Sequence, residues 1–157
     1  MNLLPTLLLT GANNHDWQRT SPFLACWLEK HGFGVTVAIH AGSNLENFEL
    51  LNSYSLIVSD YNGPLWNEGS RRNFAAAIEN GAGLVIFHSA NNCFEGWKEY
   101  EQMCALGFRE SSGHGDFADC EVEIVPGHPV TIGLTSFATT DEIYHGMVRV
   151  VIRRMKF

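Results

Sequence analysis

Polar side chains that could bind and protonate a ligand follow three short apolar stretches of this sequence. His15 and Trp17 lie in the polar segment after the first stretch, and Asp60 and Asn62 come directly after a later one. His88 ends a third apolar run. An imidazole changes its protonation state near neutral pH, so His88 is a candidate general acid or base. The alternative is a neutral histidine that caps the end of a strand.

Two further candidates lie in the last third of the chain. His114 stands between two glycines, where it has no obvious packing role, and this favours a functional one. The polar cluster at 141–145 contains Glu142 and Tyr144, which share a face if the segment is extended; if it is helical, Glu142 and His145 do. A Glu-x-x-His pair can chelate zinc, but histidines scattered over loops are weak evidence for a zinc site. No metal is therefore expected.

Motifs for nucleotides and for nucleophilic catalysis are absent from the sequence. There is no Gly-x-Gly-x-x-Gly and no Walker loop, and residues 10–14 differ from the Ser/Thr-rich phosphate loop of a flavodoxin. Ser89 lacks the Gly-x-Ser-x-Gly frame of a nucleophile elbow, and Cys93 lies several residues further on. Amide and carboxylate groups beside a tryptophan ring instead suit a neutral polyhydroxylated ligand, and no cofactor is expected.

Apolar runs that alternate with amphipathic segments predict the elements that position these groups. The expected strands are 6–10, 35–39, 54–59, 84–87 (buried on both faces) and a half-exposed 120–124. The expected helices run from a cap at Thr20 or Ser21 to His31, and over 45–51, 65–80 and 94–106. Residues 107–118 are expected to be irregular, and 127–129 form a turn.

This alternation predicts an α/β fold: a flavodoxin-like, doubly wound, mainly parallel sheet with helices on both faces. With the strand order 2-1-3-4-5, the loops after the first and third strands flank one crevice. His15, Trp17, Asp60 and Asn62 would meet there, and the strand that ends at His88 would lie beside them.

Composition limits the classes of partner. The 157 residues are 45% apolar and 17% charged, as in an ordinary single domain. The net charge of −7 argues against nucleic acid or an anionic membrane as the main partner. The four cysteines form no Cys-x-x-Cys pair, and the apolar start lacks the features of a signal or anchor. These features predict a cytoplasmic protein with reduced, buried cysteines.

The last residues differ from the rest of the chain. Arg149, Arg153, Arg154 and Lys156 are four of the ten basic residues. The predicted division is therefore an α/β domain over 1–147 and an atypical basic tail over 148–157. Deleting 153–157 is expected to change the free energy of unfolding by less than about 1 kcal/mol.

Five motifs of this sequence occur together in a known order. They are Asn13-Asn14-His15-Asp16-Trp17, the segment 81–90 ending in Phe87-His88-Ser89-Ala90, Gly113-His114-Gly115, His128-Pro129-Val130-Thr131 with Gly133-Leu134, and Asp141-Glu142-Ile143-Tyr144-His145. Over about residues 5–147 the chain thus resembles the ThuA-like (trehalose utilisation) family. The resemblance implies a class I glutamine amidotransferase-like fold with histidine in place of the nucleophile. It also implies a role in the catabolism of trehalose and related disaccharides through their 3-keto derivatives.

The resemblance leads to a hypothesis for the site. His88, His114 and Glu142 are expected to be general acid–base groups around a small-molecule sugar. His15, Trp17, Asp60 and Asn62 would hold the sugar, and Tyr144 would orient it. The reaction would be hydrolysis, elimination or isomerisation without a cysteine or serine nucleophile. The alternatives are a non-catalytic carbohydrate-binding or regulatory module and a metal-dependent hydrolase, with zinc as the candidate metal.

The chain departs from the family pattern at two points. Ala118 stands where relatives often have another histidine, and relatives continue well past the position of Phe157. A truncated member is therefore expected, with an open sheet edge and apolar surface that favour homo-oligomers.

Overall fold

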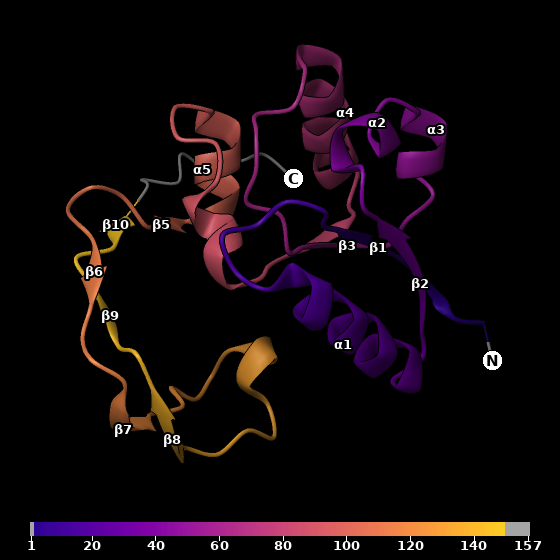
Figure 1. The fold of residues 1–157 in the computed structure, drawn as a ribbon. Coiled ribbons are helices and arrows are strands. Elements are labelled where there is room, and N and C mark those ends of the chain that lie inside the picture. The colour runs from indigo at the N-terminus through magenta and orange to yellow at the C-terminus, as the bar shows by residue number, and fades with distance from the viewer. Residues whose placement is uncertain (1, 150–157) are drawn as a thin grey trace. The chain divides into compact units, whose positions relative to one another are not determined.

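The computed structural model describes residues 2–149, which divide into two compact units (Figure 1). Unit 1 comprises residues 2–107 with Arg149, and unit 2 is Phe108–Val148. Residues 150–157 lie outside the described residues, so the predictions for the basic tail and for the domain boundary at 147 stay predictions.

A parallel sheet of four strands forms the centre of unit 1, in the order β2-β1-β3-β4. The strands are β1 (Leu4–Leu9), β2 (Phe33–Ala38), β3 (Leu56–Ser59) and β4 (Gly83–Ile86). Leu7 pairs with Thr36 on one side and with Ile57 on the other, and Ile57 pairs with Leu84. The flavodoxin-like, doubly wound α/β prediction is confirmed, and its strand order holds for the first four strands.

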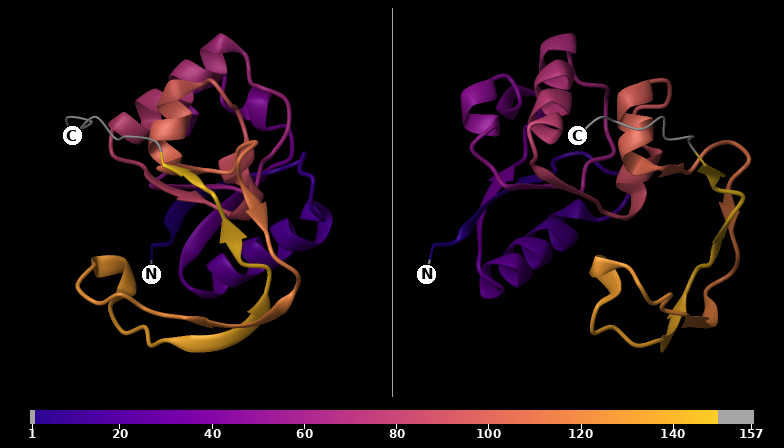
Figure 2. Two further views of the ribbon diagram at one scale, coloured as in Figure 1. Left: turned by 90° about the vertical axis from the view of Figure 1, so that its left-hand side faces the viewer. Right: turned by 180° about the vertical axis from the view of Figure 1, so that it is seen from behind.

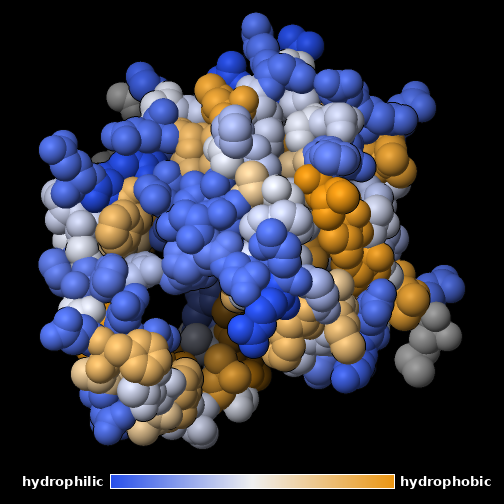
Figure 3. Space-filling view, viewed as in Figure 1, coloured by the Kyte–Doolittle hydropathy of each residue, from blue (hydrophilic) through white to orange (hydrophobic). Residues whose placement is uncertain are grey.

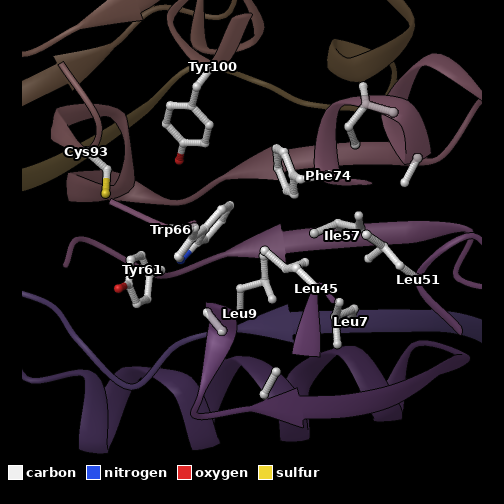
Figure 4. Packing of buried hydrophobic residues seen from close by; sticks show 14 of the residues in the cluster. Leu7, Leu9, Leu45, Leu51, Ile57, Tyr61, Trp66, Phe74, Cys93 and Tyr100 are labelled. Carbon is white, nitrogen blue, oxygen red and sulfur yellow. The ribbon is translucent and has the colours of Figure 1, made fainter. Parts of the chain in front are cut away.

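Helices cover both faces of this sheet (Figures 1 and 2). They are α1 (Trp17–Lys30) on one face, and α2 (Ala41–Asn44), α3 (Phe48–Leu51), α4 (Glu68–Glu79) and α5 (Lys98–Cys104) on the other. Successive side chains of a strand point to opposite faces, so β1 supplies both cores. Leu8 packs with Leu28 of α1, whereas Leu7 and Leu9 join the larger cluster that contains Phe74 (Figure 4).

Side-chain hydrogen bonds explain why the helix boundaries differ from the predicted ones. The start of α1 at Trp17 precedes the predicted cap at Thr20 or Ser21, because both hydroxyls donate to Asp60 instead of capping. The predicted helix over 45–51 is two short helices, α2 and α3, and Asn47 caps the second. The predicted helix over 94–106 shortens to α5, which follows a segment with positive φ at Phe94 (57°).

The strand predicted to be buried on both faces, β4, is an outer strand of this sheet. Its Val85 is 45% exposed, because the sheet has no further strand beside β4 within residues 2–149. An apolar band also crosses the surface over the opposite edge strand, β2, where Val37 and Ile39 are exposed (Figure 3). Cys26 is exposed as well, which corrects the prediction that all four cysteines are buried.

Unit 2 contains short antiparallel pairs in place of the predicted fifth parallel strand. β7 (Ala118–Val122) pairs with β8 (Phe137–Asp141), and β6 (Gly113–His114) pairs with β9 (Tyr144–His145). The two-residue strands β5 (Leu106–Gly107) and β10 (Val148–Arg149) lie at the unit boundaries. The segment 107–118 is largely irregular, as predicted, and no residue of unit 2 is buried. Within residues 2–149 no helix is long and apolar enough to cross a membrane.

Candidate functional site

The loops after β1 and β3 meet at one edge of the sheet, as the predicted strand order requires. The side-chain amide of Asn13 donates to Asp60 Oδ1 (3.0 Å) and to its carbonyl oxygen (3.2 Å). Further along the two loops, Asn62 Nδ2 donates to Asn14 Oδ1 (2.8 Å). Parallel strands place their carboxyl ends at the same edge, and these bonds join the two loops there.

His88 lies beside His15, although 73 residues separate them. Their Nε2 atoms are 3.1 Å apart, and the ring centroids are 4.3 Å apart at an interplanar angle of 70°. Both residues are exposed. Two imidazole nitrogens at this distance share one hydrogen, so one donates and the other accepts. The sequence predicted His15 to be a sugar ligand, and the structure makes it the partner of the predicted acid–base group.

Asn13 and Ser89, which the sequence prediction did not include, hold the two histidine-bearing segments together. Asn13 Oδ1 accepts from Ser89 Oγ (2.7 Å) and from the backbone N–H of His15 (3.0 Å). The amide thus links the loop after β1 to the residue that follows His88. Its signals in the sequence are its place in the polar run after β1 and in the first of the five motifs. Neither identifies this role, because an asparagine there is as well explained by a local turn.

The Asp60 carboxylate anchors the loop, and its role as a sugar ligand stays a prediction. It is 2% exposed. Its Oδ2 accepts from Thr20 Oγ1 (3.0 Å) and Ser21 Oγ (2.7 Å), and its Oδ1 accepts from Asn13. A buried carboxylate needs such partners because burial removes its hydration. Among the other predicted ligands, Trp17 begins α1 and is half-buried, as is Asn62.

The backbone at His88 is left-handed, with φ of 46°. β4 ends at Ile86, and a 3₁₀ turn, His88–Asn92, follows at once. The hydroxyl of the buried Tyr100 supports this turn by donating to the carbonyl oxygen of Ala90 (3.0 Å). Burial, with a smaller contribution from the neighbouring Cys104 thiol, raises the pKa of Tyr100 well above its usual value. The hydroxyl therefore stays protonated and keeps donating at neutral pH.

Unit 2 brings the other three predicted residues together. The β6–β9 register sets His114 opposite Tyr144, with ring centroids 5.9 Å apart. His114 Nδ1 lies 3.6 Å from Glu142 Oε2, and the two side chains are 45% and 42% exposed. Residues 141–145 are not helical, so the extended alternative is confirmed. Partial burial, and then the Glu142 and Asp141 carboxylates, raise the pKa of Tyr144. Its hydroxyl is thus a hydrogen-bond donor near neutral pH.

Residues 2–149 contain no preformed metal-binding site. No group of three or more histidine, cysteine, aspartate or glutamate side chains is placed to hold an ion there. Two imidazoles alone are fewer than the three protein ligands typical of a catalytic zinc. The expectation of a metal-free protein stays a prediction.

Comparisons with known proteins agree with the fold. The family model described as ThuA, trehalose utilisation, matches residues 6–154. The structure is similar to a ThuA-like protein from Parabacteroides merdae ATCC 43184, with 30% identity and a TM-score of 0.81 over 92% of this chain and 63% of that one. It also resembles the fold of a ThuA-like protein from Bacteroides uniformis ATCC 8492, with 21% identity and a TM-score of 0.69 over 90% and 60%. The chain thus spans less than two thirds of either structure. Comparison with curated proteins gave no match.

Proposed function

This chain belongs to the ThuA family of trehalose utilisation, and we propose that it acts on a sugar or keto-sugar by general acid–base catalysis with histidine. Family membership supports a role in carbohydrate utilisation. The observation that carries the chemistry is the pair of imidazoles, His15 and His88, whose Nε2 atoms are 3.1 Å apart at the switch point of the sheet.

The pair can move two protons in one reaction. In a 3-keto sugar the hydrogen on C2 is acidic, because it lies next to the carbonyl group. One imidazole takes this proton as the general base, and the electron pair of the C2–H bond forms the C1–C2 double bond as the C1–O bond breaks. The leaving oxygen then receives a proton from the other imidazole, so that charge and atoms balance. An imidazole serves both roles near neutral pH.

The remaining predicted residues keep separate parts in the proposal. Trp17 and Asn62 belong to the same loops as the histidine pair and offer a ring face and an amide to a sugar. In unit 2, the Glu142 carboxylate lies 3.6 Å from His114 Nδ1, and the Tyr144 hydroxyl is a donor beside them. We assign His114 and Glu142 to acid–base work and Tyr144 to ligand orientation.

The test is turnover of 3-keto-trehalose by His88→Asn. We expect the variant to lose about 10²- to 10⁴-fold in kcat/KM. Its unfolding midpoint should change little, because asparagine keeps hydrogen-bonding groups and adopts a left-handed backbone readily. His40→Asn is the matched control, since His40 is exposed and its side chain makes no cap to α2. A fall in stability of more than about 2 kcal/mol in His88→Asn would make His88 a structural residue.

The same assay separates catalysis from binding alone. Sugar binding without product at every pH between about 5 and 9 would identify a carbohydrate-binding or regulatory module and exclude the enzyme. Metal analysis adds an independent check, and we expect well under one equivalent of zinc. Stoichiometric zinc that disappears in His88→Ala would favour a metal-activated water.

A further inference from the structure

We propose that Asn14 is a positioning residue that fixes the tautomer of His15 and so makes His15 the proton acceptor of the histidine pair. Asn14 Oδ1 lies 3.1 Å from His15 Nδ1. The catalytic meaning of this contact rests on the proposed function, whereas the tautomer itself is a property of the resting protein.

The hydrogen bonds around Asn14 identify the atom that carries the proton. An amide oxygen can only accept, so a hydrogen bond between His15 Nδ1 and Asn14 Oδ1 requires the hydrogen on Nδ1. Asn62 Nδ2 donates to the same oxygen at 2.8 Å, so the Asn14 amide presents its oxygen to both neighbours. A neutral His15 with its hydrogen on Nδ1 has a free electron pair on Nε2.

This tautomer sets the direction of proton transfer in the pair. His15 Nε2 must accept from His88 Nε2, which is 3.1 Å away, so His88 is the donor in the resting state. Both hydrogen bonds are therefore donated in the same direction, from His88 to His15 and from His15 to Asn14. Asn14 orients the imidazole as the aspartate of a catalytic triad does, but it brings no negative charge that would favour the imidazolium.

The loop does not depend on the Asn14 side chain for its position. Asn14 is exposed, and the backbone N–H of Asn62 is bound by the carbonyl oxygen of Ala12 at 2.8 Å. The bonds from Asn13 to Asp60 hold the same loop from the other side. A substitution at Asn14 should therefore change the orientation of His15 without displacing the loop.

The experiment is ¹⁵N NMR of the histidine rings in the wild type and in Asn14→Leu, at a pH where the rings are neutral. The wild type should show His15 with its hydrogen on Nδ1, and Asn14→Leu should lose that preference. The variant should also lose about 10- to 100-fold in kcat with little change in KM. Asn14→Asp keeps an acceptor and should restore the tautomer.

Asn52→Leu is the matched control for the loss of an amide oxygen. It removes the acceptor of a similar exposed pair, in which Asn80 Nδ2 donates to Asn52 Oδ1 at 3.0 Å. The control should leave the His15 tautomer and kcat unchanged.

The two proposals fail in different ways. A wild-type His15 with its hydrogen on Nε2 overturns the role of Asn14, whatever the activity, and this holds even if Asn14→Leu does not fold. An unchanged tautomer in a folded Asn14→Leu does the same. The predicted tautomer in a wild type that turns over no sugar leaves the role of Asn14 intact and refutes the proposed function.

Discussion

Both units contain histidines that could act as acids or bases, but the strands that hold them are packed very differently. In unit 1 the histidine pair stands on a sheet with a core on both faces, and Phe74, Trp97 and Tyr100 pack in its larger cluster. In unit 2, His114 lies on the two-residue strand β6 and Glu142 lies between β8 and β9. Several apolar side chains of this unit are exposed, and Ile132 is 81% exposed. A site needs its groups held to within about 0.5 Å, and packing supplies that precision in unit 1 alone.

The difference follows from how each sheet is built. Parallel strands joined by crossover helices are covered on both faces, so β1 buries its last four residues and β3 its last three. An antiparallel two-stranded ribbon such as β7–β8 has no second layer of its own and is marginally stable. Unit 2 should therefore open more readily than unit 1.

Hydrogen exchange should show the largest difference between the units. Amides in β1 and β3 should exchange only on global unfolding, whereas those in β7 and β8 should exchange through local opening. With a global stability of about 5 kcal/mol or more, the protection factors should differ by at least about 10³-fold. Equal protection in the two sheets would show that unit 2 is held as firmly as unit 1.

A matched pair of phenylalanine substitutions, one in each unit, tests the same comparison through the free energy of unfolding. Phe74 is fully buried, so Phe74→Ala should reduce the free energy of unfolding by about 3–5 kcal/mol in denaturant titrations. Phe137 of β8 is 52% exposed, and Phe137→Ala should cost less than about 1 kcal/mol. Similar losses in both variants would contradict the division into a packed and an unpacked unit.

Tyr100 gives a smaller effect that depends on pH. Tyr100→Phe removes its bond to Ala90 and should cost about 1 kcal/mol at neutral pH. Burial raises the pKa of Tyr100, so the folded protein keeps a proton that the unfolded chain releases near pH 10. The unfolded state then binds fewer protons, and the free energy of unfolding should fall as the pH rises above about 10.

Stability measured between about pH 8 and 11 checks this prediction. The decline should be weaker in Tyr100→Phe than in the wild type. Tyr144→Phe in unit 2 is the comparison. The pKa of Tyr144 is also raised, but Tyr144 is less buried, so this variant should weaken the decline less than Tyr100→Phe does. Identical slopes for the wild type and Tyr100→Phe would show that Tyr100 does not stay protonated in the folded state.

The features that the sequence predicted are those set by local pattern and strand topology. Apolar runs placed the four strands, and their order brought the loops of His15 and Asn62 together. The turn at His128, whose Nδ1 accepts from the Val130 N–H, also follows from local residue types.

The features that the sequence missed depend on side chains that are distant along the chain. The pairing of His15 with His88 and the bond from Ser89 to Asn13 join residues more than 70 positions apart, and neither leaves a periodic signal. Asp60 was assigned to the ligand because a carboxylate at this sheet edge suits sugar hydroxyls, and the sequence did not reveal the three side chains that compensate its burial. The edge position of β4 was missed because an apolar run does not reveal how many neighbours a strand has.

At position 88 the left-handed backbone favours glycine or asparagine for stability, whereas the proposed chemistry requires histidine. A φ of 46° costs a histidine about 1–2 kcal/mol that glycine does not incur, and asparagine tolerates it better. A mutant library selected for heat resistance alone should therefore enrich glycine or asparagine at this position, whereas selection for growth on the substrate should retain histidine. The residue found at position 88 would therefore show whether the library had been selected for heat resistance or for growth on the substrate.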